Sequence, residues 1–572
     1  MATASSNANT SKEWLIVTAI DIGTTFSGWA YSTVNDPEKI YANQTWYAGE
    51  GTLASLKTSS CILFTPEKEF KKFGYDAETE FVRLAEENKH REWYFFERFK
   101  MALIDDRNIN RNTQIKDISG KKMPALNVFA NAIKFLKDNF YATYRKRVTF
   151  SKETDVTYVL TVPSIWNDMA KRFMREAAFE AGIPNNQLII ALESEAAAIW
   201  CQRIPTELPH RDLAISTVGT CNIIVDLGGG TADITVHKQP SNDTLVEIHK
   251  PTGGPWGGVE VDKKFIELMK SFFGSSHWKD FEENELEDLL SVKRDFETQK
   301  RIIKLDTCNN IVIKIPRSLE DNYEPKSDTS ENLFGNKIVL NRGKLRIDVS
   351  LLKKCFADPV DKVIGNVKKI LSKKSTRNVS RIILVGGFSE SLYVQGIFEA
   401  HFADKSIFIP PECGLAVLKG AVLFGQNPSI VTARIARFTY GLEIAVPFDP
   451  KIHPSDKRRN SHAGPVCIDS FWKAVEKGEV IKDGHEVSRV GKAAFNNQCR
   501  GELKIFKSKS RNPMFTTDHS CECIGSFVIP MNRRLKAEDS NVSEVFIFGS
   551  TELRVRANQR TFRDTHEIYI HM

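Results

Sequence analysis

The stretch NIIVDLGGGTADITV, residues 222–236, decides the fold. Its apolar first half ends in a carboxylate, Asp226, after which come three glycines at 228–230, then Thr231 and a second alternating run. This pattern predicts a strand, a tight turn and a second strand. Glycine lets such a turn adopt positive φ and lets backbone N–H groups approach an anion closely. An anion-binding turn beside an aspartate suited to Mg²⁺ is what a nucleoside triphosphate requires.

A second stretch, LIVTAIDIGTTFSGWAY at residues 15–31, repeats this plan. Its apolar run ends in Asp21, and the turn and second run that follow contain Gly23, Thr24, Thr25 and Phe26. Two similar hairpins far apart in a chain predict a duplicated fold whose halves face each other across one ligand. Neither hairpin is a P-loop, because the turn leads into a strand and no Gly-Lys-Ser/Thr follows. The plainer alternative is two ordinary hairpin turns.

Length and composition indicate a multidomain globular protein. The 572 residues are enough for two or more cores, and 41% hydrophobic and 26% charged residues are ordinary values. The net charge of +7 is small for this length, and the basic clusters are short and scattered. We therefore expect no nucleic-acid partner.

Ten cysteines are spread thinly, and most lie in apolar runs, which favours reduced, buried thiols in a cytoplasmic protein. Cys521 and Cys523 form a C-x-C pair, but no second pair stands at metal-ligand spacing, so zinc is not expected. The first residues lack an apolar core typical of a signal peptide, and no apolar run approaches the length of a membrane span. Residues 1–13 are small and polar, and we expect them to be disordered.

Between the two hairpins the pattern is mixed α/β. Residues 81–103 are aromatic-rich with helical period and carry Arg98 and Lys100, either of which is a candidate cation for phosphates or a plain surface charge. Further expected elements are a helix at 127–147, a strand at 156–162 ended by a proline, a helix at 167–182, and a helical segment within 188–200 that contains Glu193.

Beyond the second hairpin, glycine-rich turns again precede helices. The turn at 253–258, which includes Gly257 and Gly258, opens an expected helix at 259–273, and helix N-termini can bind anions. A charged helix at 281–303 bears Glu297, Lys300 and Arg301, and another helix is expected at 361–371. A strand from 381 ends at Gly386 and Gly387, at the carboxyl edge where ligands of α/β sheets gather.

From about residue 428 helical periodicity gives way to short alternating runs separated by turn residues, which predict an antiparallel β-sandwich. The predicted organisation is a two-lobed α/β nucleotide-binding domain at 14–427, a linker at 428–436 and a β-sandwich at 437–572, with no helical lid after it. The linker carries Thr432 and Arg434 among apolar residues, so weak docking of the linker is expected.

These segments together resemble the seventy-kilodalton heat-shock protein family, within the actin/hexokinase/heat-shock ATPase superfamily. The resemblance runs over nearly the whole chain and rests most on the two phosphate motifs, DIGTTFS from Asp21 and DLGGGTAD from Asp226. It also includes VPSIWND at 162–168, LESEAAA at 192–198, ETQKR at 297–301 and the glycine pair at 386–387.

The departures from the family pattern are informative. Phe388 and Glu390 stand where the family usually carries a Ser and an Arg beside the adenine, and Ser194 replaces a Pro after Glu193. The linker lacks the acidic-then-leucine run of the family. This pattern is similar to the atypical 12A/12B-like branch.

The resemblance implies a role for each motif residue. Asp21, Asp226 and Asp233 would hold Mg²⁺ and its waters, and Glu193 would order the metal shell and the attacking water. Lys100 would meet the transferred phosphate, with Asp226 and Thr231 completing the catalytic group. The phosphates would be cradled by Gly23, Thr24, Thr25, Phe26, Gly228, Gly229, Gly230, Thr231, Gly257 and Gly258, and the nucleoside by Glu297, Lys300, Arg301, Gly386, Gly387 and Phe388.

The implied function is binding, with slow hydrolysis, of MgATP or MgADP by an atypical heat-shock ATPase of the cytoplasm and the stress response. Its β-sandwich would bind protein or peptide clients, and co-chaperones are further implied partners. Two alternatives stay open: a nucleotide-binding scaffold without useful turnover, and a sugar-kinase-like phosphotransferase on the same fold. The sequence does not determine the oligomeric state.

Overall fold

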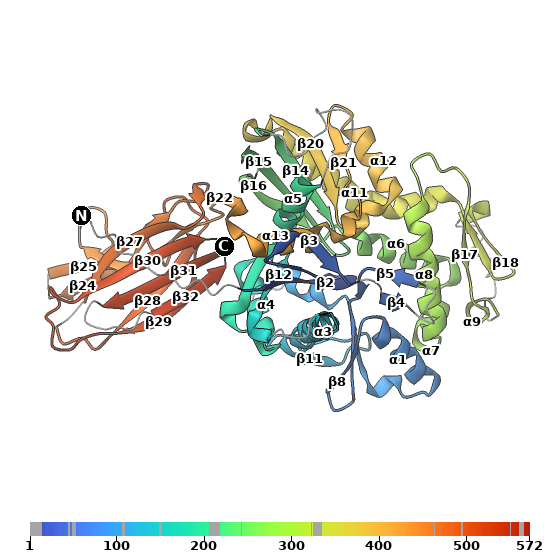
Figure 1. The fold of residues 1–572 in the computed structure, drawn as a ribbon, viewed down its shortest axis with the longest axis horizontal. Coiled ribbons are helices and arrows are strands. Elements are labelled where there is room, and N and C mark those ends of the chain that lie inside the picture. Colours follow the sequence, from blue (N-terminus) through green and yellow to red (C-terminus); the bar gives the residue numbers. More distant parts are fainter. Residues whose placement is uncertain are drawn as a thin grey trace.

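The computed structural model describes residues 14–571 except 44–45, 49–52, 106–108, 148–151, 205–217, 242, 322, 324–333, 463, 494–495, 550 and 560–565. Two α/β lobes lie side by side, and a pair of antiparallel sheets projects from one side of them (Figure 1). The disorder predicted for residues 1–13 lies outside the described residues.

Lobe I is built on a sheet in the order β13-β12-β1-β2-β3. The predicted first hairpin forms, since β1 and β2 are antiparallel and Asp21 lies opposite Gly28. β12 and β13 add parallel to β1. The strands are β1 (Ile16–Ile22), β2 (Phe26–Thr33), β3 (Asp36–Ala42), β12 (Val156–Val162) and β13 (Leu188–Leu192), with β6 (Thr58–Ser59) paired to β2.

Lobe II repeats this topology, as the paired hairpins predict. Its sheet runs β21-β20-β14-β15-β16, again an antiparallel meander with two strands added in parallel. In the second hairpin Asp226 lies directly opposite Asp233. The strands are β14 (Cys221–Leu227), β15 (Ala232–Ser241), β16 (Thr244–Gly254), β20 (Val379–Val385) and β21 (Ser406–Phe408).

Two helices, α5 (Glu193–Arg203) and α13 (Ala416–Gln426), pack against each other in the core between the lobes. They approach so closely that a Cβ on Gly420 would lie 1.6 Å from the carbonyl oxygen of Ala196. The run of alanines at 196–198 therefore serves the close packing that its composition predicts. The outer faces are covered by α3 (Ala125–Arg145) and α4 (Asp168–Glu180) in lobe I and by α6 (Gly258–Phe273) and α11 (Val349–Leu371) in lobe II.

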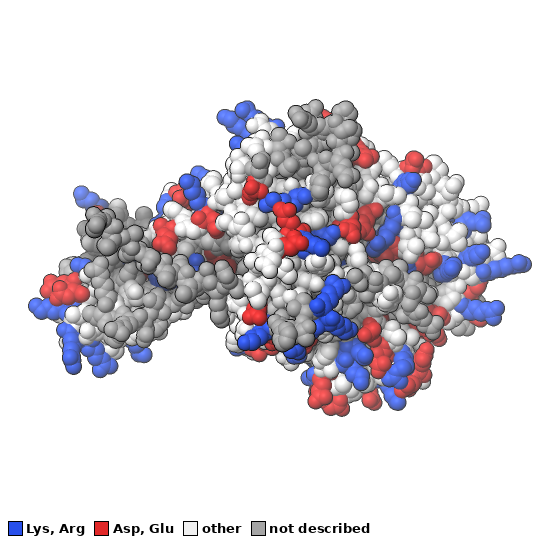
Figure 2. Space-filling view, viewed as in Figure 1, with Lys and Arg blue, Asp and Glu red and all other residues white. Residues whose placement is uncertain are grey.

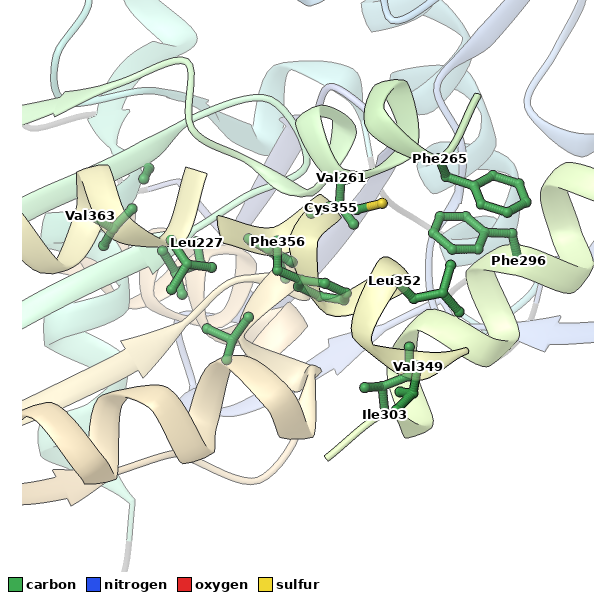
Figure 3. Packing of buried hydrophobic residues seen from close by; sticks show 14 of the residues in the cluster. Leu227, Val261, Phe265, Phe296, Ile303, Val349, Leu352, Cys355, Phe356 and Val363 are labelled. Carbon is green, nitrogen blue, oxygen red and sulfur yellow. The ribbon is translucent and has the colours of Figure 1, made fainter. Parts of the chain in front are cut away.

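The core of lobe II fixes the helix that carries the predicted nucleoside contacts, α8 (Leu286–Ile302). Phe296 of α8 stacks on Phe265 of α6, with ring centroids 3.7 Å apart and planes within 3° (Figure 3). Smaller elements complete the lobes: β4 (Trp46–Ala48), β5 (Leu53–Ser55), β7 (Cys61–Phe64), β8 (Phe70–Phe73), β10 (Gln114–Lys116), β11 (Lys122–Pro124), α7 (Ser275–Asn284), β17 (Ile311–Lys314), α9 (Arg317–Glu320), β18 (Ile338–Asn341), β19 (Lys344–Ile347) and α12 (Leu392–His401).

Four helix predictions need correction, one of them because the helix expected at 361–371 already begins at Val349 as α11. The segment 81–103 is not one helix, because α1 (Tyr75–Glu86) is followed by a strand, β9 (Tyr94–Glu97), and then by the short α2 (Ala102–Asp105). The phenylalanines of β9 are buried by pairing with β7, so tertiary pairing overrides their helix-like spacing. The helix predicted within 188–200 begins only at Glu193, since the residues before it form β13. The helix predicted at 281–303 is interrupted at Glu285, between α7 and α8.

The C-terminal part consists of two antiparallel sheets that share a hydrophobic core. The short alternating runs predicted there form strands. One sheet contains β24 (Arg458–Ser461), β25 (Gly464–Val475), β23 (Thr439–Pro447), β28 (Arg500–Ser508) and β29 (Cys521–Pro530). The other contains β27 (His485–Lys492), β30 (Asn541–Gly549), β31 (Glu552–Gln559) and β32 (His566–His571).

The predicted linker is a strand of lobe II. β22 (Val431–Ile435) pairs with β16 on one side and with β26 (Val480–Lys482) on the other, so the lobe II sheet continues into the C-terminal part. Arg434, expected to weaken docking, instead makes two 2.8 Å hydrogen bonds to the buried carboxylate of Glu195. The segment is therefore held on lobe II by a polar contact between Arg434 and Glu195 in addition to strand pairing.

Two further surface properties bear on function. No helix within the described ranges is long and apolar enough to cross a membrane. On the face shown in Figure 2, basic and acidic side chains are interspersed and form no broad field of one sign.

Candidate functional site

The two glycine turns meet each other at the centre of the molecule. A Cβ on Gly229 would lie 2.4 Å from Thr25 Oγ1, and a Cβ on Gly230 would lie 2.4 Å from Thr24 Oγ1. Only glycine allows this close approach, which explains the residue type at both positions. The hairpins predicted to face one ligand therefore do face each other.

The turn at 228–230 is held from behind by the start of α6. The backbone N–H groups of Gly257, Gly258 and Val259 donate to the carbonyl oxygens of Gly230, Gly228 and Gly229 at 3.2, 3.2 and 2.8 Å. The glycines at 257 and 258, predicted to contact phosphate, thus support the phosphate turn in this structure. Such hydrogen bonds preorganise the turn for an anion.

Four carboxylates are buried around this meeting point. Asp21 and Asp226 lie at the ends of β1 and β14, because each follows the apolar run of its hairpin. Asp233 lies in β15, and Glu193 is the first residue of α5. The duplicated topology brings together residues that are far apart in the sequence.

Lysine ammonium groups and a threonine hydroxyl satisfy part of this cluster. Lys57 Nζ and Thr161 Oγ1 each donate to Asp21 at 2.8 Å. Lys100 Nζ donates to Glu193 Oε1 at 2.6 Å. The backbone N–H of Ile165 donates to Asp233 Oδ1 at 2.8 Å, whereas Asp233 Oδ2 is buried without a partner among the described residues. An unsatisfied buried carboxylate oxygen is costly, so it points to a missing partner.

The pKa values of three of these carboxyl groups are raised, because the groups are buried close to one another. Burial raises the pKa of Asp226 well above its usual range, and the charges of Glu193, Asp233 and Asp21 add to this. Burial also raises the pKa of Glu193 to about 7 and that of Asp233 to about 6, although Lys100 opposes both shifts. Burial alone would raise the pKa of Asp21, but Lys57 and Lys100 hold it below its usual value.

A hard divalent cation fits this donor set. Carboxylate oxygens suit Mg²⁺, which normally keeps several waters and takes only one or two protein carboxylates together with phosphate oxygens. In the part of the chain that is described, no three carboxylate, imidazole or thiolate groups converge as a full metal shell. Oxygen donors of this kind fit hydrated Mg²⁺ with a phosphate ligand, and the assignment of Asp21, Asp226 and Asp233 to the cation stays a prediction.

Two partners in the cluster, Lys57 and Thr161, belong to no motif in the sequence, whereas Trp166 lies in the VPSIWND stretch. Lys57 and Thr161 bind Asp21, and the ring of Trp166 lies 5.5 Å below Lys100 Nζ. Thr161 was open to prediction, because it lies in a strand that pairs beside β1. Lys57 follows a short irregular segment, and nothing in its neighbourhood signals the contact.

The predicted nucleoside contacts on α8 form a second, partly exposed ion network. Lys300 Nζ donates to Asp262 Oδ1 at 2.7 Å and also pairs with Glu297. Arg301 Nε donates to Glu297 Oε1 at 3.0 Å, and Arg301 NH1 donates to Glu390 Oε2 at 3.0 Å. Glu390 belongs to the short helix η8 (Gly387–Glu390), so this ion pair joins α8 to the turn after β20.

The glycines after β20 lie beside the carboxylate cluster, whereas the ring of Phe388 points away from it into the core. Gly386 has φ +87°, and a Cβ there would lie 2.5 Å from Asp226 Oδ1. A Cβ on Gly387 would meet nothing within 4 Å, so this residue faces open space. The ring of Phe388 lies in the lobe II core near Phe356, so the predicted pocket contact from this ring is not found. The remaining candidate, Phe26, is half-buried at the start of β2.

Arg98, the alternative to Lys100 as phosphate cation, has another role. It takes the left-handed conformation with φ 54°, and its guanidinium pairs with Asp262 of lobe II at 3.1 Å. Lys100 is buried and points to Glu193, so Lys100 is the residue placed in the cluster.

Comparisons with known proteins identify relatives over most of the chain. The sequence model of the Hsp70 protein family matches residues 93–444, more than half of the chain. The chain is 30% identical to heat shock 70 kDa protein 12B of Homo sapiens, over 95% of this chain and 89% of the relative. It is also 30% identical to heat shock 70 kDa protein 12A of Homo sapiens, over 96% and 90%. Chaperone protein DnaK of Endomicrobium trichonymphae is 24% identical over 51% of this chain and 43% of the relative.

The matched region includes the second phosphate hairpin, the Lys100–Glu193 pair and the α8 network, so sequence and geometry agree on the same part of the molecule. The chain therefore belongs to the Hsp70 family, in a branch like that of the heat shock 70 kDa proteins 12A and 12B.

Proposed function

We propose that this protein binds MgATP and MgADP between its two lobes and hydrolyses ATP slowly. Membership of the Hsp70 family supports an ATPase-type nucleotide-binding role. The observation that carries the proposal is the cluster of four buried carboxylates at the meeting point of two phosphate-type turns. Four carboxylates face only two lysines, Lys57 and Lys100, and a divalent cation would offset this imbalance and bind phosphate oxygens as well.

In this proposal the carboxylates and Lys100 of the cluster have different roles. Asp21, Asp226 and Asp233 hold the hydrated cation, which neutralises charge that develops on the phosphates. Glu193 orders the attacking water and can accept its proton, because its carboxylate is buried in the cluster beside Lys100. Lys100 Nζ donates to Glu193 Oε1 at 2.6 Å. When a phosphate is bound, its oxygens can accept further hydrogen bonds from this ammonium group.

The phosphates rest on neutral groups. Thr24, Thr25 and Thr231 supply hydroxyls, and the turns at Gly23 and 228–230 supply backbone N–H groups. Because these donors are already fixed by the contacts between the turns, binding requires little reorganisation.

Calorimetric titration of the full chain with ATP, in Mg²⁺ and in EDTA, tests the binding. Saturable binding that weakens at least tenfold in EDTA is expected, because the carboxylates repel an unaccompanied triphosphate. Single-turnover measurement with excess protein then tests hydrolysis. Binding without any release of phosphate would favour the scaffold reading over the ATPase, and no binding in either condition would contradict the proposal.

The C-terminal sheets are the proposed site for protein or peptide clients. The edge strands of the five-stranded sheet, β24 and β29, carry backbone groups that a bound extended segment can pair with. Fluorescence anisotropy of a labelled apolar peptide tests this, with Val528→Lys on β29 as a variant, since Val528 is exposed. Saturable binding that the variant weakens would support the site, and unchanged binding would place the peptide elsewhere. A cytosolic location and co-chaperone partners stay predictions.

A further inference from the structure

A lysine of lobe I, Lys57, neutralises the first aspartate of the cluster. Its Nζ donates to Asp21 Oδ2 at 2.8 Å, and Thr161 Oγ1 donates to Asp21 Oδ1, also at 2.8 Å. Both carboxylate oxygens of Asp21 therefore have partners from the chain itself. Asp233 Oδ2, by contrast, is buried without a partner among the described residues. The need for a further positive group is thus greater at this lobe II aspartate than at Asp21.

The fold places Lys57 beside the first hairpin. Lys57 directly precedes β6, which pairs with β2, and its backbone N–H donates to Ser55 Oγ at 3.3 Å. The stem of its side chain crosses Gly28, the residue opposite Asp21, because a Cβ on Gly28 would lie 3.1 Å from Lys57 Cγ. The glycine therefore leaves the room that lets the ammonium group reach Asp21.

The ammonium group of Lys57 acts on both hairpins and remains accessible. Burial and the neighbouring carboxylates raise the pKa of Asp226, and the charge of Lys57 opposes this rise. The side chain of Lys57 keeps 15% of its surface exposed, compared with 5% for Lys100. A lysine ammonium has three donors, so one hydrogen bond to Asp21 leaves it able to bind an anion as well.

Taking the proposed nucleotide site as its basis, we infer that Lys57 is a built-in cation of that site. It offsets the charge of Asp21 before any ligand binds, and it gives a bound phosphate a second ammonium partner besides Lys100. A nucleotide without a divalent cation should therefore retain measurable affinity, because one carboxylate of the cluster is already neutralised. Mg²⁺ alone should bind weakly, because the ammonium of Lys57 competes for Asp21.

Titration calorimetry of the full chain with ADP, in Mg²⁺ and in EDTA, tests this inference. For Lys57→Met we expect the affinity for ADP to fall at least tenfold in EDTA but less than threefold in Mg²⁺, since a divalent cation makes up for the lost charge. Titration with MgCl₂ alone should show Mg²⁺ binding to this variant at least threefold more tightly than to the wild type. Lys57→Arg keeps the charge and should keep the ratio of the two ADP affinities near its wild-type value.

A matched control is Lys116→Met, which removes the charge of an exposed lysine on β10 and should alter none of these constants. Should Lys57→Met fail to fold, Lys57→Gln provides the same comparison, because its amide can still donate to Asp21 without carrying a charge.

The outcomes separate this inference from the proposed function. An equal loss of ADP affinity in Mg²⁺ and in EDTA overturns the role of Lys57 and leaves the nucleotide site intact. A lower melting temperature of Lys57→Met with an unchanged ratio of the two affinities also overturns it, because the ion pair then only stabilises the hairpin. The same holds if the wild type binds ADP in Mg²⁺ and shows no binding in EDTA. Failure of the wild type to bind ADP in either condition contradicts the nucleotide site itself, and with it this inference.

Discussion

Glu193 links the charge of the cluster to its chemistry. Its carboxylate is buried, bound to Lys100, and close enough to Asp21 and Asp233 for their charges to raise its pKa. In the proposed site the turns and the threonines bind the phosphates, so removing the charge of Glu193 should separate binding from hydrolysis. Lys100 keeps Asp21 as a second counter-charge, which limits the structural damage of the substitution.

For Glu193→Gln we therefore predict ATP binding within about threefold of the wild type and hydrolysis reduced roughly a hundredfold or more, the usual cost of losing one preorganised polar group. Single-turnover rates and calorimetric affinities measure the two effects. Glu399→Gln serves as the control on an exposed helix surface. A parallel loss of binding and hydrolysis would show that Glu193 holds the nucleotide and has no separate role in the reaction.

Glu247 predicts a pH dependence of stability at the junction of lobe II and the linker. Burial raises its pKa to about 7, from 4.5, with the charge of Glu195 adding to the shift. Between these values the folded protein holds a proton that the unfolded chain has released. The contribution of Glu247 is thus present below about pH 4.5 and is lost as pH rises through about 7, with a magnitude on the order of 1 to 3 kcal/mol.

Glu247→Gln isolates this effect from the other carboxylates. We expect the variant to gain melting temperature relative to the wild type as pH rises from 5 to 7.5, because glutamine never carries the buried charge. Differential scanning calorimetry at several pH values measures the difference. A difference that does not change with pH would show that Glu247 titrates near its usual value.

The crossing of α5 and α13 sets the distance between the lobes. Gly420→Val would drive a side chain into the carbonyl of Ala196, where an ideal Cβ already lies at 1.6 Å, so we predict destabilisation by more than about 3 kcal/mol. Gly365 is the matched control, since it lies in the exposed middle of α11 with nothing within 4 Å of its Cβ position. Gly365→Ala should gain up to about 1 kcal/mol. Denaturant unfolding compares the two, and similar costs would contradict this account of the helix crossing.

Elements were predictable where one local pattern dominates. The paired hairpins follow from apolar runs that end in Asp and Gly, and β12 has the bounds predicted for it. The segment 81–103 was mispredicted because its phenylalanines fit a helical period, whereas pairing with β7 makes part of it a strand. Phe388 was expected in the pocket because it stands where the resembled family carries a residue beside the adenine, but its ring lies in the core of lobe II.

Contacts made by isolated side chains were beyond sequence reasoning. Lys57 and Asp262 belong to no motif, yet one binds Asp21 and the other binds both Arg98 and Lys300. Arg434 was expected to weaken the linker, since a charge interrupts an apolar run. Arg434 instead helps to hold the linker, because it hydrogen-bonds the buried carboxylate of Glu195 on α5.

The C-terminal sheets are attached to lobe I by buried ion pairs. Lys507 Nζ lies 2.9 Å from Asp168 Oδ2, and the side chains of both are about nine-tenths buried. Arg175 pairs with Glu552, and the Thr551 hydroxyl donates to the carbonyl of Ile190 at 2.7 Å. Removing one member of a buried pair is strongly destabilising, because it leaves a buried charge without compensation.

We predict that Lys507→Glu separates the C-terminal sheets from lobe I, because it places like charges together at a cost on the order of 3 to 5 kcal/mol. Small-angle scattering should show a larger radius of gyration. The double variant Asp168→Lys, Lys507→Glu restores opposite charges and should recover most of the compact form. An unchanged radius in the single variant would mean that strand pairing between β22 and β26 is enough to hold the parts together.

The most direct test of the central claim is a thermal melt of the wild type and of Asp226→Ala, with and without MgATP. Ligand at about a hundred times its dissociation constant stabilises the folded state by about 2.7 kcal/mol. We predict that saturating MgATP raises the melting temperature of the wild type by several degrees and leaves that of Asp226→Ala nearly unchanged, because Asp226 lies in the buried cluster proposed to hold the cation. A wild-type melting temperature that does not move in saturating MgATP would contradict the account.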